Sequence, residues 1–185
     1  MPTNKSNIYQ FKIALKNIKP KIWRRIQIPS NYNFLELHAA IQDAMGWYDC
    51  HLHQFEMKTD RYYGLIIGTD ECDELDRKAK LSKYFKYPKD RALYDYDFGD
   101  GWEHEIVLEK ILSKTIDDKY PKCIAGRRAC PPEDCGGFWG YEELLIIMKN
   151  PDHEEYAERI EWLGEKFDSE TFDPASVSFR NVLKR

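Results

Sequence analysis

Residues 94 to 104 read Tyr-Asp-Tyr-Asp-Phe-Gly-Asp-Gly-Trp-Glu-His. On both sides of the glycines, ring-bearing side chains alternate with acidic ones, which is the period of a strand with one buried face. Asp100-Gly101 supplies the positive φ that a tight hairpin turn requires. The stretch therefore predicts a hairpin with strands over residues 92–98 and 102–111.

The same alternation continues toward the N-terminus. Apolar and polar side chains alternate over residues 8–16 and 22–28, a second hairpin bracketed by Pro20 and Pro29. Residues 51–57 and 62–67 have the composition of two further strands. Together these patterns predict about six strands.

Helices are predicted between and after these strands. Asn33 and Glu36 form a capping-box pattern, and Gly46 closes the helix that they open. Residues 70–80 are interpreted as a loop that runs into a short helix over residues 81–85, and residues 113–137 as loop-rich. The C-terminal portion, from about residue 138 to residue 185, is interpreted as helical. Its predicted helices are residues 141–149, one that Asp152 caps, and a short one within residues 172–185.

The order of these elements is ββαββ(α)ββ, followed by helices. It predicts an α+β fold, with a mainly antiparallel sheet and helices packed on one side. A chain of 185 residues with 12 Tyr, 9 Phe and 5 Trp can build an ordered core without disulfides or metals. Residues 1–185 are therefore interpreted as a single domain.

Charge and composition narrow the function classes. The net charge of −4 disfavours a dedicated nucleic-acid binder. No apolar run reaches the roughly 18 residues that a transmembrane helix needs, and residues 1–7 lack the apolar core of a signal peptide. The sequence therefore predicts a cytoplasmic protein without membrane contacts. Its five cysteines then indicate reduced thiols or metal ligands rather than disulfides.

Three of these cysteines lie close together in the sequence. Cys123, Cys130 and Cys135 are spaced C-x6-C-x4-C, and His104 offers an upstream nitrogen. Three thiolates and one imidazole can hold zinc as a tetrahedral site, so zinc is the predicted cofactor if there is one. Alternatively, the cysteines are small buried residues that brace a loop.

Two histidines and an aspartate form a second candidate set. His51 and His53 are two positions apart on a predicted strand, so both side chains would point to one face and ligate a metal or a polar ligand. Alternatively, they bond backbone or tyrosine groups at the edge of the core. Asp97 ends a strand near His104, where it would orient that imidazole or join a metal shell. A calcium loop starting at Asp95 is excluded, because glycine and glutamate are absent from its sixth and twelfth positions.

Basic residues form a third candidate set, for nucleic acid. They flank the first predicted hairpin and follow a glycine in the cysteine loop, where they would contact phosphates: Lys21, Arg24, Arg25, Arg127 and Arg128. The alternative is that they are solvated charges on a strand face. No serine or cysteine catalytic signature is present, so no catalytic residue is assigned.

Several motifs together resemble the Ri-plasmid (pRiA4b) ORF-3-like family, which is also labelled as insertion-element passenger proteins of TnpR type. The resemblance covers nearly the whole chain, and the family implies an α+β domain. The TnpR label implies an association with mobile elements. The motifs, in order, are Pro20-Lys21-Ile22-Trp23-Arg24-Arg25, the helix over residues 35–47, His51-Leu52-His53-x-Phe55, Tyr94-x-Tyr96-Asp97-Phe98-Gly99-Asp100-x-Trp102-x-His104 and Cys130-Pro131-Pro132-Glu133-Asp134-Cys135-Gly136-Gly137.

These observations predict a binding or accessory domain that recognises a ligand or protein partner through a polar pocket. The residues expected in the pocket are His51, His53, Asp97, His104, Glu133 and Asp134. A first alternative is a metal-dependent hydrolase, with the histidines and Asp97 as ligands and Glu133 or Asp134 as base. A second alternative is a DNA-associated adaptor in transposition or recombination.

Overall fold

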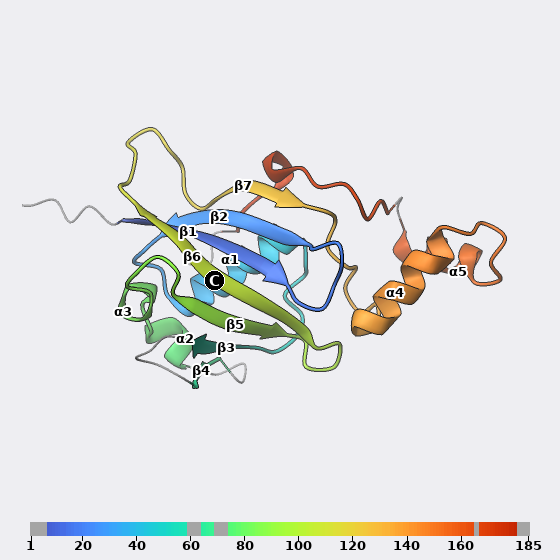
Figure 1. Ribbon diagram of the computed structural model, residues 1–185, viewed down its shortest axis with the longest axis horizontal. Coiled ribbons are helices and arrows are strands. Elements are labelled where there is room, and N and C mark those ends of the chain that lie inside the picture. Colours follow the sequence, from blue (N-terminus) through green and yellow to red (C-terminus); the bar gives the residue numbers. More distant parts are fainter. Residues whose placement is uncertain (1–6, 59–63, 69–73, 165–166, 181–185) are drawn as a thin grey trace, which may run out of the picture.

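A computed structural model describes residues 7–58, 64–68, 74–164 and 167–180. These residues form one seven-stranded sheet in the order β4-β3-β5-β6-β1-β2-β7, and every neighbouring pair is antiparallel (Figure 1). The fold is thus α+β, as the sequence predicts. The strands are β1 (Ile8–Leu15), β2 (Trp23–Pro29), β3 (His53–Lys58), β4 (Leu65–Ile67), β5 (Arg91–Tyr96), β6 (Trp102–Leu112) and β7 (Lys122–Arg127).

The predicted hairpin forms the centre of the sheet. Strands β5 and β6 pair with Tyr94 opposite His104 and Tyr96 opposite Trp102. All four side chains are buried, and this burial fixes the register of the hairpin. Asp97 and Asp100 lie in the turn that joins the two strands.

One strand lies where the sequence predicts only loop. Strand β7 pairs with β2 at the edge of the sheet, and a bulge interrupts the pairing between Arg25 and Ile26. Its side chains do not alternate between buried and exposed. The alternation of buried and exposed side chains that predicts a strand is therefore missing from β7. The strand forms because the edge of β2 supplies hydrogen-bonding partners for its backbone.

Helix α1 (Phe34–Met45) covers one face of the sheet (Figure 1). It begins as predicted, because the Asn33 side chain accepts from the Glu36 N–H while the Glu36 carboxylate accepts from the Asn33 N–H. Gly46 ends the helix in a left-handed conformation. Its apolar stripe packs against side chains from the central strands, which form one core.

Two of the remaining helices, α4 (Gly137–Met148) and α5 (Tyr156–Leu163), are grouped beyond one end of the sheet (Figure 1). Within the region predicted as loop, residues 74–78 form a helix. The C-terminal helices α4 and α5 form, although α4 begins four residues earlier than predicted and α5 begins after Glu155, so Asp152 does not cap it as predicted. Within residues 172–180 only a 3₁₀ turn forms, and Val182 and Leu183 lie outside the described residues. These elements are α2 (Glu74–Lys78), α3 (Leu81–Tyr84), α4 (Gly137–Met148), α5 (Tyr156–Leu163) and the turn Pro174–Ser176.

None of the helices in these described ranges has the length and apolar character that crossing a bilayer requires.

Candidate metal centre

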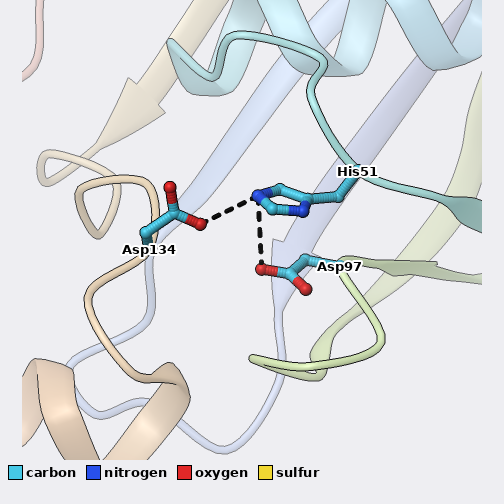
Figure 2. Close-up of side chains that lie close together, drawn as sticks. All are labelled: His51, Asp97 and Asp134. Carbon is cyan, nitrogen blue, oxygen red and sulfur yellow. Dashed lines mark hydrogen bonds and ion pairs between the residues drawn. The ribbon is translucent and has the colours of Figure 1, made fainter.

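Three side chains from distant parts of the chain meet at one end of the sheet (Figure 2). His51 lies between α1 and β3, Asp97 follows β5, and Asp134 lies between β7 and α4. The Nε2 atom of His51 is 2.8 Å from Oδ1 of Asp134 and 3.7 Å from Oδ2 of Asp97. One ligand atom from each residue lies within 4.8 Å of the other two.

The hairpin turn determines where the Asp97 carboxylate points. Asp97 has a φ of 55°, a left-handed conformation that aspartate tolerates in turns. Its Oδ1 accepts from the N–H groups of Gly99 and Asp100 at 2.9 and 3.3 Å. These contacts leave Oδ2 facing the imidazole of His51.

The loop that carries Asp134 is attached to the same hairpin turn. The N–H of Gly136 donates to Oδ2 of Asp100 at 3.2 Å. Gly137 has a φ of 66°, and a Cβ atom there would lie 2.4 Å from the carbonyl oxygen of Asp100. The two glycines therefore permit close packing of loop against turn, which holds Asp134 near Asp97.

A fourth carboxylate, that of Glu133, lies beside this group. Its Oε1 is 4.0 Å from Nε2 of His51 and accepts a short hydrogen bond from the Tyr96 hydroxyl. Its Oε2 accepts from the N–H of Tyr48 at 2.8 Å. Burial and, secondarily, the hydrogen bond to Glu133 raise the pKa of Tyr96. The hydroxyl therefore remains a donor to Glu133 well into the alkaline range.

These distances suit a shared cation. Ligand atoms that each lie about 2.0–2.2 Å from one ion are roughly 3–3.5 Å apart, close to the separations around His51. The group offers one imidazole nitrogen and two carboxylates, a donor set that first-row divalent metals accept. With side-chain exposures of 31% for His51 and 66% for Asp134, the group is open to solvent.

A cavity of about 1080 Å³ adjoins the group. On the side of this group, the cavity is lined by Glu133, Asp134, Tyr48 and Cys50. The end of α1 and side chains from residues 162–163 and 167–178 contribute further walls. An ion held by His51, Asp97 and Asp134 would therefore lie next to a space large enough for a small molecule.

His53 does not join His51. Strand β3 begins at His53, so His51 precedes the strand and the predicted alternation does not relate the two side chains. The His53 ring stacks on His38 with centroids 3.6 Å apart, and its Nε2 lies 2.9 Å from Oδ2 of Asp76. His53 thus belongs to a separate polar cluster under α1.

The predicted zinc site of His104 with three cysteines is not assembled. His104 is fully buried, its Nδ1–H donates to the Tyr94 carbonyl at 3.2 Å, and its ring lies beside Trp47 and Tyr94. In the described part of the chain, the one group of three candidate ligand atoms is that of His51, Asp97 and Asp134. His104 faces the apolar core, so it cannot complete a site in the cysteine loop.

The cysteines instead agree with the alternative of loop bracing. Cys123, Cys130 and Cys135 are partly buried and pack against the core. Burial raises the pKa of Cys130 and of Cys135 to about 12. Thiols of this kind are protonated at neutral pH, which disfavours nucleophilic reactivity.

The five basic residues do not form one exposed surface. Arg24 and Arg128 are buried. Arg25 makes two hydrogen bonds to the Glu109 carboxylate on the other face of the sheet. Lys21 and Arg127 are exposed. Arg24 and Arg128 therefore do not present their guanidinium groups on an outer surface where the backbone of a nucleic acid could contact them.

Sequence reasoning missed Tyr96 and Trp47 as parts of the site. Tyr96 occupies a core-facing position of β5 and uses its hydroxyl to hold Glu133. Trp47 holds the loop of Asp134 through its indole N–H. A buried Tyr or Trp normally needs a hydrogen-bond partner. The proximity of Tyr96 and Trp47 in the sequence to the predicted pocket residues could therefore have identified them.

Comparisons with known proteins give one family and two named relatives. Residues 7–176 match the family model described as "Plasmid pRiA4b ORF-3-like protein". "Uncharacterized protein y4hQ" of Sinorhizobium fredii is 32% identical over 183 residues, which cover 97% of this chain and 90% of that protein. The crystal structure of a protein of unknown function, MM3350 from Methanosarcina mazei Go1, has a TM-score of 0.84 and 49% identity, and the match covers 94% of this chain and 99% of that one.

Proposed function

The chain belongs to the plasmid pRiA4b ORF-3-like family, and we propose that it is a divalent-cation-dependent binding domain. Its metal ligands are His51, Asp97 and Asp134. The cavity beside them receives the ligand or the part of a partner that the ion helps to bind. The observation that carries the proposal is the approach of one imidazole nitrogen and two carboxylates within 4.8 Å.

Electrostatics supports an ion at this point. The carboxylates of Asp97, Asp134 and Glu133 all surround the one imidazole of His51, at distances of 3.7, 2.8 and 4.0 Å. Carboxylates gathered around one side chain experience mutual repulsion. A divalent cation bound by the same nitrogen and oxygens would offset it.

The donor set favours particular metals. Imidazole suits zinc and iron, whereas carboxylates also suit manganese and magnesium. A mixed set of one nitrogen and two oxygens should therefore bind Zn²⁺ and Mn²⁺ more tightly than Mg²⁺ or Ca²⁺.

Hydrolysis is a second candidate function, and Glu133 is the observation in its favour. Three protein ligands leave coordination positions for water, as in catalytic rather than closed structural sites. The Glu133 carboxylate is next to those positions and is held by Tyr96 and Tyr48. It is placed to accept a proton from a water bound to the ion, the role of a general base.

A DNA adaptor associated with mobile elements has less support. Such an adaptor would need basic residues gathered on one accessible surface. Among the residues considered for this role, only Lys21 and Arg127 are exposed, while Arg24 and Arg128 are buried.

Metal titration of the purified protein tests the proposal. Isothermal titration with Zn²⁺ and Mn²⁺ should give one ion per chain. Asp134→Asn and His51→Gln should each weaken the affinity at least 10-fold. The matched control is Asp152→Asn, since the exposed Asp152 carboxylate contacts no described residue.

Far-UV circular dichroism establishes that each variant is folded before the titrations are compared. Unchanged stoichiometry and affinity in folded His51→Gln and Asp134→Asn would assign the ion to other residues. Absence of any binding by the wild-type protein at millimolar metal would overturn the proposal itself.

A further inference from the structure

The cavity beside the metal centre has a second distinctive feature, a buried arginine. Arg24 lies on β2, two positions from Ile22 and two from Ile26, and shares their buried face of the strand. Its side chain therefore faces α1 rather than solvent. Only 1% of its surface is exposed, yet it lines the cavity. Among the described residues that line this cavity, Arg24 is the only one with a positive side chain.

Backbone carbonyls hold the Arg24 guanidinium in place. Its Nε donates to the carbonyl of Ala44 at 2.8 Å, and its Nη1 donates to those of Trp23 and Arg127 at 3.0 and 3.2 Å. The ring of Phe172 covers the guanidinium, with 3.6 Å between ring centroid and Cζ. The position of this cation is therefore fixed before any ligand arrives.

Arg24 makes no ion pair with any carboxylate of the described chain, and its Nη2 donates to no described acceptor. An arginine stays charged even when buried, and a buried charge without a counter-ion is costly. An anion that meets Nη2 would supply both the missing charge and the missing acceptor.

The carboxylates of the cavity have other partners and do not provide this counter-ion. Two of them pair with other arginines, Asp43 with Arg180 and Glu170 with Arg128. Asp134 lies against the imidazole of His51. Glu133 accepts from the Tyr96 hydroxyl and the Tyr48 N–H, and Asp173 accepts from the Ala175 N–H.

Apolar rings make up much of the remaining wall. They come from the end of α1, from the cysteine loop and from the C-terminal segment, and include Trp47, Pro131, Trp162, Phe167 and Phe172. Small-molecule sites are commonly apolar clefts of about 300–1,000 Å³ with a few fixed polar groups. This cavity, with one fixed cation, has that character.

We propose that the cavity binds a small organic anion with an aromatic or other apolar body, and that its carboxylate or phosphate group pairs with Arg24. Binding at Arg24 does not require the metal. That this anion is also the ligand of the neighbouring ion rests on the proposed function above. In that case the oxyanion meets Arg24 while the other end of the molecule reaches Asp134 and the bound cation.

Protection of Cys50 measures occupancy of the cavity directly. This thiol is exposed and lines the cavity, so a bound molecule should slow its reaction with a maleimide. Cys130 and Cys135 react slowly because burial raises their pKa to about 12. Burial also raises the pKa of Cys123, and a Cys72→Ser, Cys123→Ser background removes both of the remaining thiols whose reaction would otherwise interfere.

The probes form a matched series in buffer with a chelator: phenylpropionate, phenyl phosphate, phenylpropylamine and phenylpropanol. At millimolar concentration, one of the two anions should slow modification of Cys50 at least 5-fold, and the better one identifies carboxylate or phosphate. The amine and the alcohol should have little effect. Arg24→Met should abolish the protection, whereas the control Asp152→Asn, at an exposed residue outside the cavity, should retain it.

Equal protection by the amine or the alcohol, or none by either anion, would overturn the inference. So would protection that requires added metal and survives in folded Arg24→Met, since the ion would then bind the anion. If Arg24→Met does not fold, the comparison of the anions with the amine and the alcohol on the wild-type protein still tests the inference. Anion binding in chelator without any metal affinity would instead refute only the proposed function.

Discussion

The indole N–H of Trp47 donates to the carbonyl oxygen of Pro131 across 2.9 Å, in a hydrogen bond that is buried. Trp47 follows α1, whereas Pro131 precedes Glu133 and Asp134 in the loop before α4. One side chain thus ties the segment that precedes His51 to the loop that supplies the other groups of the site. The indole ring also stacks on Tyr96, the residue that holds Glu133.

Trp47→Phe should destabilise the protein and loosen the site. The Pro131 carbonyl would remain buried without its donor, which costs about 1–3 kcal/mol. Urea unfolding gives the loss in free energy, and metal titration should show weaker binding because the loop of Asp134 gains freedom. Trp139→Phe is the control, since Trp139 is 78% exposed and its replacement should change stability by less than about 0.5 kcal/mol. Equal losses in the two variants would contradict the role of the Trp47 hydrogen bond.

Gly137→Ala should be more harmful than Gly164→Ala. Both glycines have nearly the same positive φ, 66° and 67°, so both substitutions carry the conformational cost of about 1 kcal/mol. Only at Gly137 would the new Cβ collide with a backbone atom, the Asp100 carbonyl oxygen at 2.4 Å. The collision should add about 1–3 kcal/mol.

Chemical denaturation of the two glycine variants, side by side, isolates the steric effect. Gly137→Ala should also weaken metal binding, because it separates the loop of Asp134 from the turn of Asp97. If both alanines cost the same free energy of unfolding, the loop and the turn are not packed as tightly as these positions require.

His104 should make stability depend on pH. Burial lowers its pKa from an ordinary 6.5 to about 4. Between these values the unfolded chain holds a proton that the native chain does not, so stability falls as pH falls from about 6.5 to about 4. The total loss is about 3 kcal/mol, at up to about 1.4 kcal/mol for each pH unit. Burial lowers the pKa of His38 as well, which contributes in the same direction.

Urea unfolding at pH 7, 6 and 5 measures this slope. His104→Leu should be less stable than the wild type at pH 7 but lose less stability on acidification. His153→Gln is the control for replacing a histidine, because His153 lies outside the core. An identical slope in His104→Leu would refute the pH dependence assigned to His104.

Tyr96→Phe should affect Glu133 through a single atom. The variant removes the donor to Oε1 of Glu133 and the acceptor of the Cys50 N–H. A loss of about 1–3 kcal/mol in stability is expected, since buried polar groups lose their partners. Metal affinity should fall roughly 10-fold, as is typical when a group that orients the metal surroundings is removed.

The same titration and unfolding experiments on Tyr48→Phe provide the control for Tyr96→Phe. The Tyr48 side chain is 76% exposed, and only its backbone N–H contacts Glu133. Tyr48→Phe should therefore match the wild type. Wild-type metal affinity in Tyr96→Phe would show that Glu133 does not need its tyrosine partner.

Local patterns were sufficient for the central elements of the fold. The hairpin of Asp100-Gly101, the strands before α1 and the capping box of Asn33 and Glu36 all form at the predicted places. Each depends on residues close in sequence, whose side-chain period or turn chemistry acts within a few positions. Strand β7 lacks such a period, and it forms because the edge of β2 offers hydrogen-bonding partners.

The same limit applies to charged residues on strands. Arg24 is two positions from Ile22 and two from Ile26, so the strand period places it on the same buried face. Charged side chains are usually solvated, which argued against this placement. Its burial depends on the carbonyls of Ala44 and Arg127, which come from α1 and β7. A pattern of neighbouring residues in the sequence cannot predict hydrogen-bonding partners that come from distant elements.

The sequence by itself determined the α+β fold, the family and the residues His51, Asp97, Glu133 and Asp134 as a candidate set. Only the tertiary structure decided which of the predicted residues meet. His53 and His104 turn toward the core, whereas the loop of Asp134 packs on the turn of Asp97 and beside His51. The physical reason is that strand alternation assigns a side chain to a face, whereas distances across 37 to 83 residues depend on how loops pack against one another.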